Sequence, residues 1–162
     1  MRVLDALAAE RAYAASATGA ALPDIAPALA GAVASHHLAV AAPRSFSIVG
    51  AGDDAVASLA AHRTWFAPRD IRCTDAAVAA AVGGRVVSPA EALAADIVCV
   101  HVPIVLFPEQ LRRGTHVNAL AGATLSDELE KSARIAYELA SLAAGLVDGR
   151  RLDEITIYLR AT

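Results

Sequence analysis

The stretch SFSIVGAGDDAVASLAA, residues 45–61, decides the fold. It begins with an apolar segment that contains Phe46, Ile48 and Val49, continues into a glycine turn, and ends in an alanine-rich pattern typical of a helix. A strand, a tight turn and a helix in this order form a binding site for a dinucleotide pyrophosphate, because the first N–H groups of the helix are free to bind phosphate oxygens. We therefore expect a βα unit with a nucleotide-binding turn.

The turn itself follows the pattern G-x-G-x-x-A and consists of Gly50, Ala51, Gly52, Asp53, Asp54 and Ala55. The first glycine permits the tight turn, and the second lets the backbone approach phosphates without a Cβ. The alanine allows helix and strand to pack closely. The two aspartates suit the positive end of a helix, but they would also repel a pyrophosphate placed there. The same residues therefore fit a second interpretation, in which the turn holds no ligand.

Composition limits the class of protein. The 162 residues suit one domain that buries its own core. The net charge of −3, together with the lack of a basic run, argues against a nucleic-acid partner. No apolar run reaches the roughly 18 residues of a membrane-spanning helix, and the first ten residues lack the apolar core of a secretory signal. We expect no membrane association and a cytoplasmic location.

The two cysteines, Cys73 and Cys99, fall inside expected strands. They are typical of small buried apolar residues in a reducing compartment.

Strands and helices alternate along the chain. Expected strands are residues 46–49, 71–74, 85–87, 96–103, 115–120 and 154–160, and expected helices are 1–20, 27–40, 54–63, 76–82, 89–95 and 126–146. The last strand would lie at the edge of the sheet or complete it. Alternation of this kind predicts an α/β fold, with a doubly wound, mainly parallel sheet flanked by helices. We expect an N-terminal helical segment, 1–43, and a Rossmann-like dinucleotide-binding domain, 44–162.

Asp75 follows the second expected strand and lies 23 residues after Gly52. In dinucleotide-binding folds an acid about 20 residues after the glycines binds the ribose hydroxyls of NAD and disfavours the 2′-phosphate of NADP. The same aspartate also suits the N-cap of the following helix. The two roles are compatible.

Several segments, taken in order, resemble the ornithine cyclodeaminase/mu-crystallin family. They are residues 50–55 (GAGDDA), 95–98 (ADIV), 111–119 (LRRGTHVNA), 149–151 (GRR) and 153–158 (DEITIY). The GTHVNA and DEIT segments are more specific than the glycine turn. The resemblance covers residue 43 to the C-terminus and implies a Rossmann domain that binds a nicotinamide dinucleotide. Family members pass a hydride between this cofactor and an amine or imine carbon.

By position, the resemblance implies a set of cofactor-binding residues. The glycine turn would hold the pyrophosphate and Asp75 would face the adenosine ribose. The nicotinamide side of the cleft would be lined by His101, Val102, Asn118, Ala119 and Leu120. We expect NAD as the cofactor, if the site is still used.

The sequence also departs from the family pattern. Family members carry an additional domain that supplies a substrate-binding lysine and arginine. Here Lys131 is the only lysine in the chain, and it falls at no corresponding position. An aspartate that takes part in the family's chemistry is replaced by Ala123. Between this position and the DEIT segment, a single long helix stands in place of the family's strand and loops. We therefore expect an incomplete catalytic site.

Other arrangements of reactive side chains are weak. Cys99, His101 and His116 lack a fourth metal ligand, and His36 and His37 are adjacent on a helix and point apart. No G-x-S-x-G motif supports a hydrolase built on Ser45, Ser47 or Ser58.

Two functions remain open. One is a minimal dinucleotide-binding protein that works in a homo-oligomer or with a protein partner and has lost the complete catalytic site. The alternative is an NAD-dependent oxidoreductase or cyclodeaminase that acts on an amino acid or imine, with the missing groups supplied by a second protomer or partner.

Overall fold

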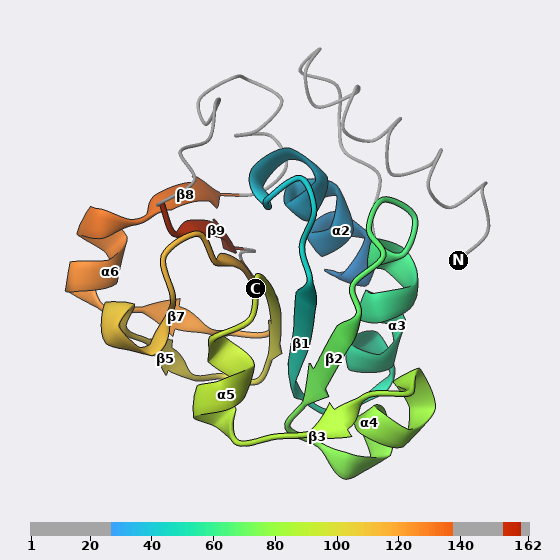
Figure 1. Cartoon of the computed structure of the whole chain (residues 1–162). Helices are drawn as coiled ribbons and strands as arrows, with labels where there is room; N and C mark the ends of the chain where they lie inside the picture. The colour runs from blue at the N-terminus through green and yellow to red at the C-terminus, as the bar shows by residue number, and fades with distance from the viewer. Residues whose placement is uncertain (1–26, 138–153, 160–162) are drawn as a thin grey trace.

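Seven parallel strands form the central sheet of the computed structural model, which describes residues 27–137 and 154–159 (Figure 1). The strand order is β3-β2-β1-β4-β6-β9-β8. The bounds are β1 Ser45–Gly50, β2 Asp70–Cys73, β3 Arg85–Val86, β4 Ile97–His101, β6 His116–Ala119, β8 Arg134–Tyr137 and β9 Thr156–Leu159. A separate two-stranded sheet pairs β5, Val105–Leu106, with β7, Thr124–Leu125. The expected Rossmann-like α/β fold is confirmed.

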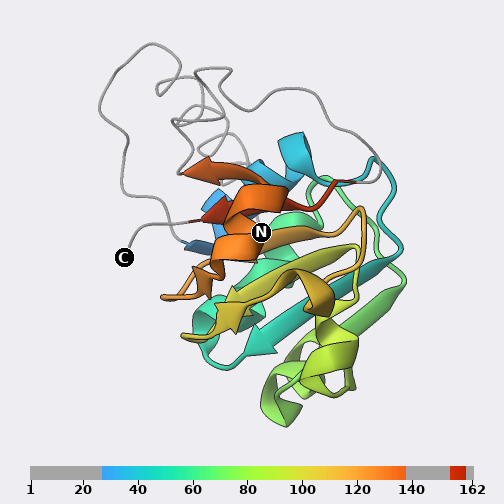
Figure 2. The ribbon, with the colours of Figure 1, turned by 90° about the vertical axis from the view of Figure 1, so that its left-hand side faces the viewer.

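Helices cover both faces of the sheet. Their bounds are α2 Pro27–Leu38, α3 Asp53–His62, α4 Ala76–Val82, α5 Pro89–Leu93 and α6 Asp127–Ser132, with a 3-10 helix, η1, at Pro108–Gln110. Most buried apolar residues of α2, α3 and α4 belong to one core, and those of α5 and α6 belong to the other. Ala28 and Ala32 of α2 form a small separate cluster with Ala61 of α3. Figure 2 turns the face with α5 and α6 toward the viewer.

The two cores are separated by the strands, whose side chains alternate between them. In β1, Phe46 and Ile48 enter the first core and Val49 enters the second. In β4, Ile97 and Cys99 face the first core, while Val98 and Val100 face the second. Because both faces are covered, β4 reads as a continuous apolar run, as expected of a central parallel strand.

The expected helix starts agree with the structure where a cap is visible in the sequence. Asp75, Ser88 and Ser126 each accept a hydrogen bond from the backbone N–H three residues later, at 2.9, 3.2 and 3.2 Å. Both cysteines are free and buried, as expected. The expected helix at 1–20 lies outside the described residues.

The expectation of one helix over 126–146 is wrong in its described part. Helix α6 ends at Ser132, Ala133 is extended, and Arg134–Tyr137 form strand β8. The alanine-rich pattern favours a helix locally. The backbone of β8 instead pairs with β9, beginning with the Arg134 N–H bonded to the Ile155 carbonyl at 2.9 Å. The family's strand is therefore not replaced by a helix, and residues 138–146 lie outside the described part.

Strand β9 lies between β6 and β8, so it completes the sheet and does not form its edge. The sequence did not predict β5 or β7, which have two residues each. Helix α2 packs against α3 and touches β6 and β9. The division at residues 43 and 44 stays a prediction. No helix in the described ranges is both long and apolar enough to cross a membrane.

Candidate functional site

The strand order reverses between β1 and β4. From β1 the chain adds β2 and β3 on one side, and then returns to place β4 on the other. Open α/β sheets bind ligands at the carboxyl edge beside this reversal. Gly50, the last residue of β1, is in register with His101, the last residue of β4. The glycine turn therefore lies at the expected place in the fold.

Gly50 is fixed by its surroundings. Its φ is 119°, and a Cβ added to it would lie 2.9 Å from Val102 Cγ1 and 3.0 Å from the carbonyl carbon of His101. Its N–H donates to Thr74 Oγ1 at 3.0 Å, which ties the turn to the end of β2. Only glycine fits both the backbone angle and the close approach of β4.

Gly52 is open where Gly50 is crowded. It is the N-cap residue of α3, has a φ of 99°, and has no side chain that could cap the helix. A Cβ added to it would meet no atom within 4 Å. Residues 51–54 are exposed, whereas Ala55 is fully buried against the first core. The first turn of α3 thus presents uncapped N–H groups to an open space, which is the cradle that a pyrophosphate fills.

The charges near this cradle are negative. Asp53 and Asp54 are both exposed in the first turn of α3. His101 is half-buried, and its Nε2 lies 2.8 Å from Ser58 Oγ. Burial lowers the pKa of His101, against the opposing charge of Asp54. The imidazole is therefore neutral at pH 7 and does not offset the two carboxylates.

Asp75 lies at the same edge, directly after Thr74. One of its carboxylate oxygens caps α4 through the Val78 N–H at 2.9 Å, and its side chain is partly exposed. The helix-capping role is confirmed, and the ribose-binding role stays a prediction.

The structure brings Gly50, His101 and Val102 together. The cofactor-binding role expected of Asn118, Ala119 and Leu120 at the end of β6 stays a prediction. The side chain of Asn118 is fully buried, and Ala119 and Leu120 are also buried in the two cores. Gly31 of α2 lies over Asn118, because an added Cβ there would be 3.2 Å from Asn118 Cγ. The amide of Asn118 thus faces the interior beneath α2.

Asn118 is the centre of a buried polar network, defined as Ser35, Ser58, His62, Asn118, His116 and Thr156. Asn118 Nδ2 donates to Ser35 Oγ at 2.8 Å, and Asn118 Oδ1 lies 3.1 Å from His116 Nε2. Ser35 Oγ lies 2.8 Å from His62 Nε2, and His62 Nδ1 lies 2.7 Å from the Ser58 carbonyl oxygen. Thr156 Oγ1 lies 2.9 Å from His116 Nδ1 and 3.1 Å from the Leu38 carbonyl oxygen.

Hydrogen-bond chemistry sets the direction of this network. The Ser58 carbonyl can only accept, so His62 Nδ1 carries the proton and its Nε2 accepts from the Ser35 hydroxyl. Ser35 Oγ then accepts from the Asn118 amide, whose oxygen is left to accept from His116 Nε2–H. Burial lowers the pKa of His62 to about 4, although its bond to the Ser58 carbonyl opposes this effect. His62 is therefore neutral in the folded protein at pH 7.

Two fully buried serines test the energetic role of this network. Ser35 bridges His62 and Asn118, whereas Ser47 Oγ has no hydrogen-bond partner in the described part of the protein. We expect Ser35→Ala to lower the free energy of unfolding by about 2–3 kcal/mol, because His62 Nε2 and Asn118 Nδ2 each lose a 2.8 Å hydrogen bond and keep only longer contacts, such as the 3.4 Å contact between them. The matched variant Ser47→Ala should change it by less than about 1 kcal/mol or stabilise the fold. Urea denaturation measures both, and equal losses would contradict this assignment.

Sequence reasoning missed the network, although one signal was present. Ser58 and His62 are four residues apart, so they share one face of α3 with buried Ala55 and Leu59. Polar residues on an apolar helix face indicate a buried hydrogen-bonded cluster. Their partners on α2 and β6 are distant in sequence, and only the fold brings them together.

The other reactive side chains have structural surroundings. Burial raises the pKa of the Cys99 thiol to about 12, so it stays protonated and unreactive. Ser58 is fully buried, and Ser45 bonds to Asp96. Among the described residues no group of three or more His, Cys, Asp or Glu side chains is placed to hold a metal ion.

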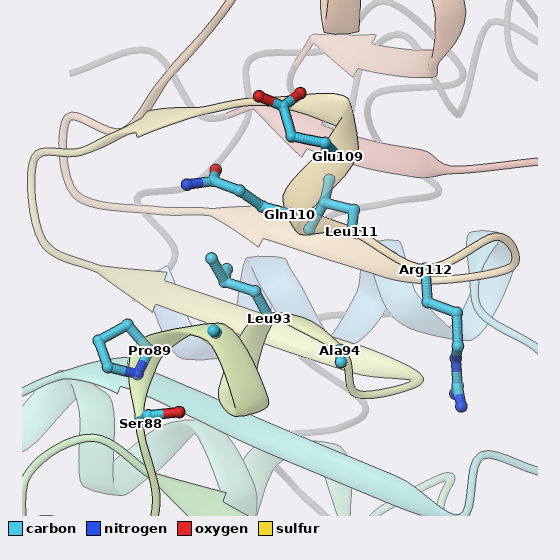
Figure 3. A pocket seen from close by; sticks show the side chains of 9 residues that line it. Ser88, Pro89, Leu93, Ala94, Glu109, Gln110, Leu111 and Arg112 are labelled. Carbon is cyan, nitrogen blue, oxygen red and sulfur yellow. The ribbon is translucent and has the colours of Figure 1, made fainter.

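A hollow of about 790 Å³ lies between α5 and η1 (Figure 3). Leu93 of α5 and Gln110 of η1 lie on its two sides, and Arg112 lies at one end. None of the expected cofactor-binding residues lines it. This hollow is therefore separate from the glycine turn.

Solved structures with the same fold support the fold assignment. An archaeal alanine dehydrogenase dimer with bound NAD matches with a TM-score of 0.74 and 23% identity, over 83% of this chain and 57% of its own. The iminosuccinate reductase of Paracoccus denitrificans in complex with NAD+ matches with a TM-score of 0.68 and 21% identity, over 85% of this chain and 57% of its own. A lysine cyclodeaminase matches with a TM-score of 0.70 and 21% identity, over 85% of this chain and 54% of its own.

These matches confirm, at the level of the fold, the resemblance to the cyclodeaminase group. The chain spans a little over half the length of each of these structures. No protein-family model matches the sequence, and no curated protein matches it significantly.

Proposed function

We propose that this chain is a minimal, ornithine cyclodeaminase-like dinucleotide-binding domain that takes NAD or NADH across the carboxyl edge of β1 and β4. The observation that carries this proposal is the contrast between the two glycines of the turn. Gly50 is crowded by Val102 and His101, whereas Gly52 opens onto free space at the start of α3. The turn is thus closely packed on the protein side and empty on the side where a phosphate would rest.

Three further points support NAD. The alanine dehydrogenase and iminosuccinate reductase structures, which match this fold, contain bound NAD or NAD+. Asp75 follows β2 at the same edge of the sheet, and there its carboxylate would meet the ribose hydroxyls and repel the 2′-phosphate of NADP. The strand reversal lies directly beside Gly50. When bound, the nicotinamide would supply hydride transfer. The chain itself would hold the pyrophosphate at α3 and the ribose at Asp75.

The catalytic part of the proposal is that the site is incomplete within this chain. Ala123 is buried, and Lys131 is exposed on α6. Neither can supply the acid or the substrate-binding cation that the family resemblance implies at the site. We infer that the chain works in a homo-oligomer or with a protein partner, and that its role there is to present the dinucleotide.

A second candidate is an NAD-dependent oxidoreductase that acts on an amino acid or imine. His101 favours it, because a neutral imidazole bonded to Ser58 lies half-buried beside the turn. A neutral imidazole can accept a proton as a general base. Hydride transfer to or from this class of substrate, lost in His101→Gln without loss of NAD binding, would favour this second candidate.

The test of dinucleotide binding compares Gly52→Ala with Gly83→Ala by isothermal titration calorimetry. Both glycines have positive φ, 99° and 71°, and open space for a Cβ. With a ψ of 174°, Gly52 lies in a region that essentially only glycine adopts, whereas Gly83 is in the ordinary left-handed region, so Gly83→Ala controls for a positive-φ substitution that strains the backbone less. Only Gly52 lies at the cradle. We expect saturable binding of NAD+ or NADH by the unchanged protein, a loss of at least tenfold in Gly52→Ala, and unchanged affinity in Gly83→Ala. A lack of saturation at millimolar cofactor would overturn the proposal.

A second arm of this experiment removes the charges at the cradle. The double variant Asp53→Asn/Asp54→Asn should bind NAD+ about three- to tenfold more tightly at low salt, and this gain should shrink as salt screens the charges. Asp127→Asn/Glu128→Gln makes the same change in the first turn of α6 and serves as the control. An equal change of NAD+ affinity in the two double variants would mean that the phosphates do not bind at the start of α3.

A further inference from the structure

We propose that a hollow at the opposite, amino end of β1 and β2 binds a small organic anion. Its carboxylate or phosphate group would lie between Arg44 and Arg69, and its apolar part would lie against Trp65. The hollow has a volume of about 700 Å³ and is lined by residues 41–44, 65–67, 69 and 70. This volume is in the range of small-molecule sites.

The backbone holds the two arginines side by side. The Arg44 carbonyl accepts hydrogen bonds from the N–H groups of Arg69 and Asp70, at 2.9 and 3.1 Å. Ser45 is in register with Asp70, so Arg44 and Arg69 occupy the preceding pair of positions on the two strands. Both side chains are exposed and both line the hollow. Like charges opposite each other on neighbouring strands are unfavourable without an anion between them.

The nearby carboxylates are already used. Asp70 forms ion pairs with Arg72 and Arg85, at 2.7 and 3.0 Å. Asp96 accepts from the backbone N–H groups of Arg44 and Ser45 and pairs with Arg112. In the described ranges, neither the Arg44 nor the Arg69 guanidinium makes an ion pair or hydrogen bond. Each therefore keeps its full set of donors for a planar, bidentate oxyanion.

Trp65 supplies an apolar wall. It is half-buried, packs against the first core and against the small cluster of Ala28, Ala32 and Ala61, and stacks on His36 with ring centroids 5.1 Å apart. Phe66 and Pro43 are buried beside it and complete the apolar lining. A cationic pair next to an aromatic wall favours an anion carried on a flat or apolar body over a bare ion.

This hollow is distinct from the glycine turn. Arg44 precedes β1 and Gly50 ends it, and the six residues of the strand separate the two by about 20 Å. A ligand in the hollow does not occupy the dinucleotide cradle. The inference therefore does not depend on the proposed function.

Trp65 is the only tryptophan in the chain, so its fluorescence reports directly on the hollow. We would titrate benzoate, phenyl phosphate and neutral benzyl alcohol with excitation at the red edge of the tryptophan band, and confirm affinities by calorimetry. We expect a saturable change with one or both anions, and none with the alcohol. The preferred anion identifies the head group. Arg44→Gln and Arg69→Gln should each weaken binding about three- to tenfold, since each removes one charge-assisted contact.

Arg113→Gln is the matched control, because Arg113 is also exposed but lies outside the hollow. It should leave the affinity unchanged, and added NAD+ should not compete with the anion. The proposal is overturned by a linear, non-saturating change, by equal binding of the alcohol, or by equal losses in all three arginine variants. Circular dichroism spectra of each variant establish that the fold is retained.

Discussion

Asn118→Ala is expected to lower the free energy of unfolding by about 3–4 kcal/mol, a large share of the stability of a domain of this size. The amide donates to Ser35 Oγ and accepts from His116 Nε2, and it is fully buried. Its removal leaves Ser35 and His116 each without one buried partner, at about 1–3 kcal/mol per group, and opens a small cavity.

Urea denaturation followed by circular dichroism measures this loss. A double-mutant cycle with Ser35→Ala separates the network from simple packing. If the residues act as one network, the loss of stability in the double variant should be smaller than the sum of the two single losses by about 1 kcal/mol or more. A loss below about 1 kcal/mol, or strict additivity, would mean that the network does not stabilise the fold.

The fold should lose about 2 kcal/mol of stability between pH 7 and pH 5 because of His62. Burial holds the pKa of this histidine at about 4 in the folded protein, against an ordinary value of 6.5. As the pH falls below 6.5, the unfolded chain binds a proton that the folded protein excludes, so unfolding becomes easier. The loss grows down to about pH 4, where the folded form also takes the proton. Burial of His101 acts in the same direction.

The variant His62→Gln isolates this contribution. It removes the titrating group, so its stability should depend less on pH between 7 and 5, whatever its stability at pH 7. His101→Gln should flatten the dependence to a smaller extent, since His101 is only half-buried. Urea midpoints at pH 7, 6 and 5 for the three proteins measure the slopes. A full slope in His62→Gln would show that another group is responsible.

Both predictions concern one region, where α2, α3, β6 and β9 meet. Ser35 comes from α2, His62 from α3, Asn118 from β6 and Thr156 from β9. The network therefore joins a helix that precedes β1 to strands at the far end of the sequence. Loss of its central amide should therefore destabilise both α2 and the sheet, and not α2 alone.

Local features of the fold were readable from the sequence. The glycine turn, the capping residues Asp75 and Ser88, and the apolar run of β4 each depend on neighbours within a few positions. Their conformational preferences act before any tertiary contact forms, so the elements from residue 45 to 103 were placed within a few residues of their observed bounds. The strand order, and with it the reversal beside Gly50, came only from the structure.

Features that depend on residues distant in the chain could not be predicted from the sequence. Residues 134–137 have a helical pattern but form β8, because β9 supplies hydrogen bonds that the local sequence does not reveal. Asn118 was expected at the cofactor cleft, as the family resemblance implied. That role stays a prediction, whereas the bond of its side chain to Ser35, 83 positions away in the sequence, had no local signal.

The sequence by itself determined the βα turn, its glycines and its acidic charge, because steric limits and helix-end electrostatics act over a few residues. Only the tertiary structure decided which face of each strand met which helix, and hence which polar groups were buried together. It left Gly52 open and Gly50 closed against Val102, and it enclosed Asn118 beneath α2. The physical reason is that burial and hydrogen bonding between distant segments depend on how the whole sheet is assembled.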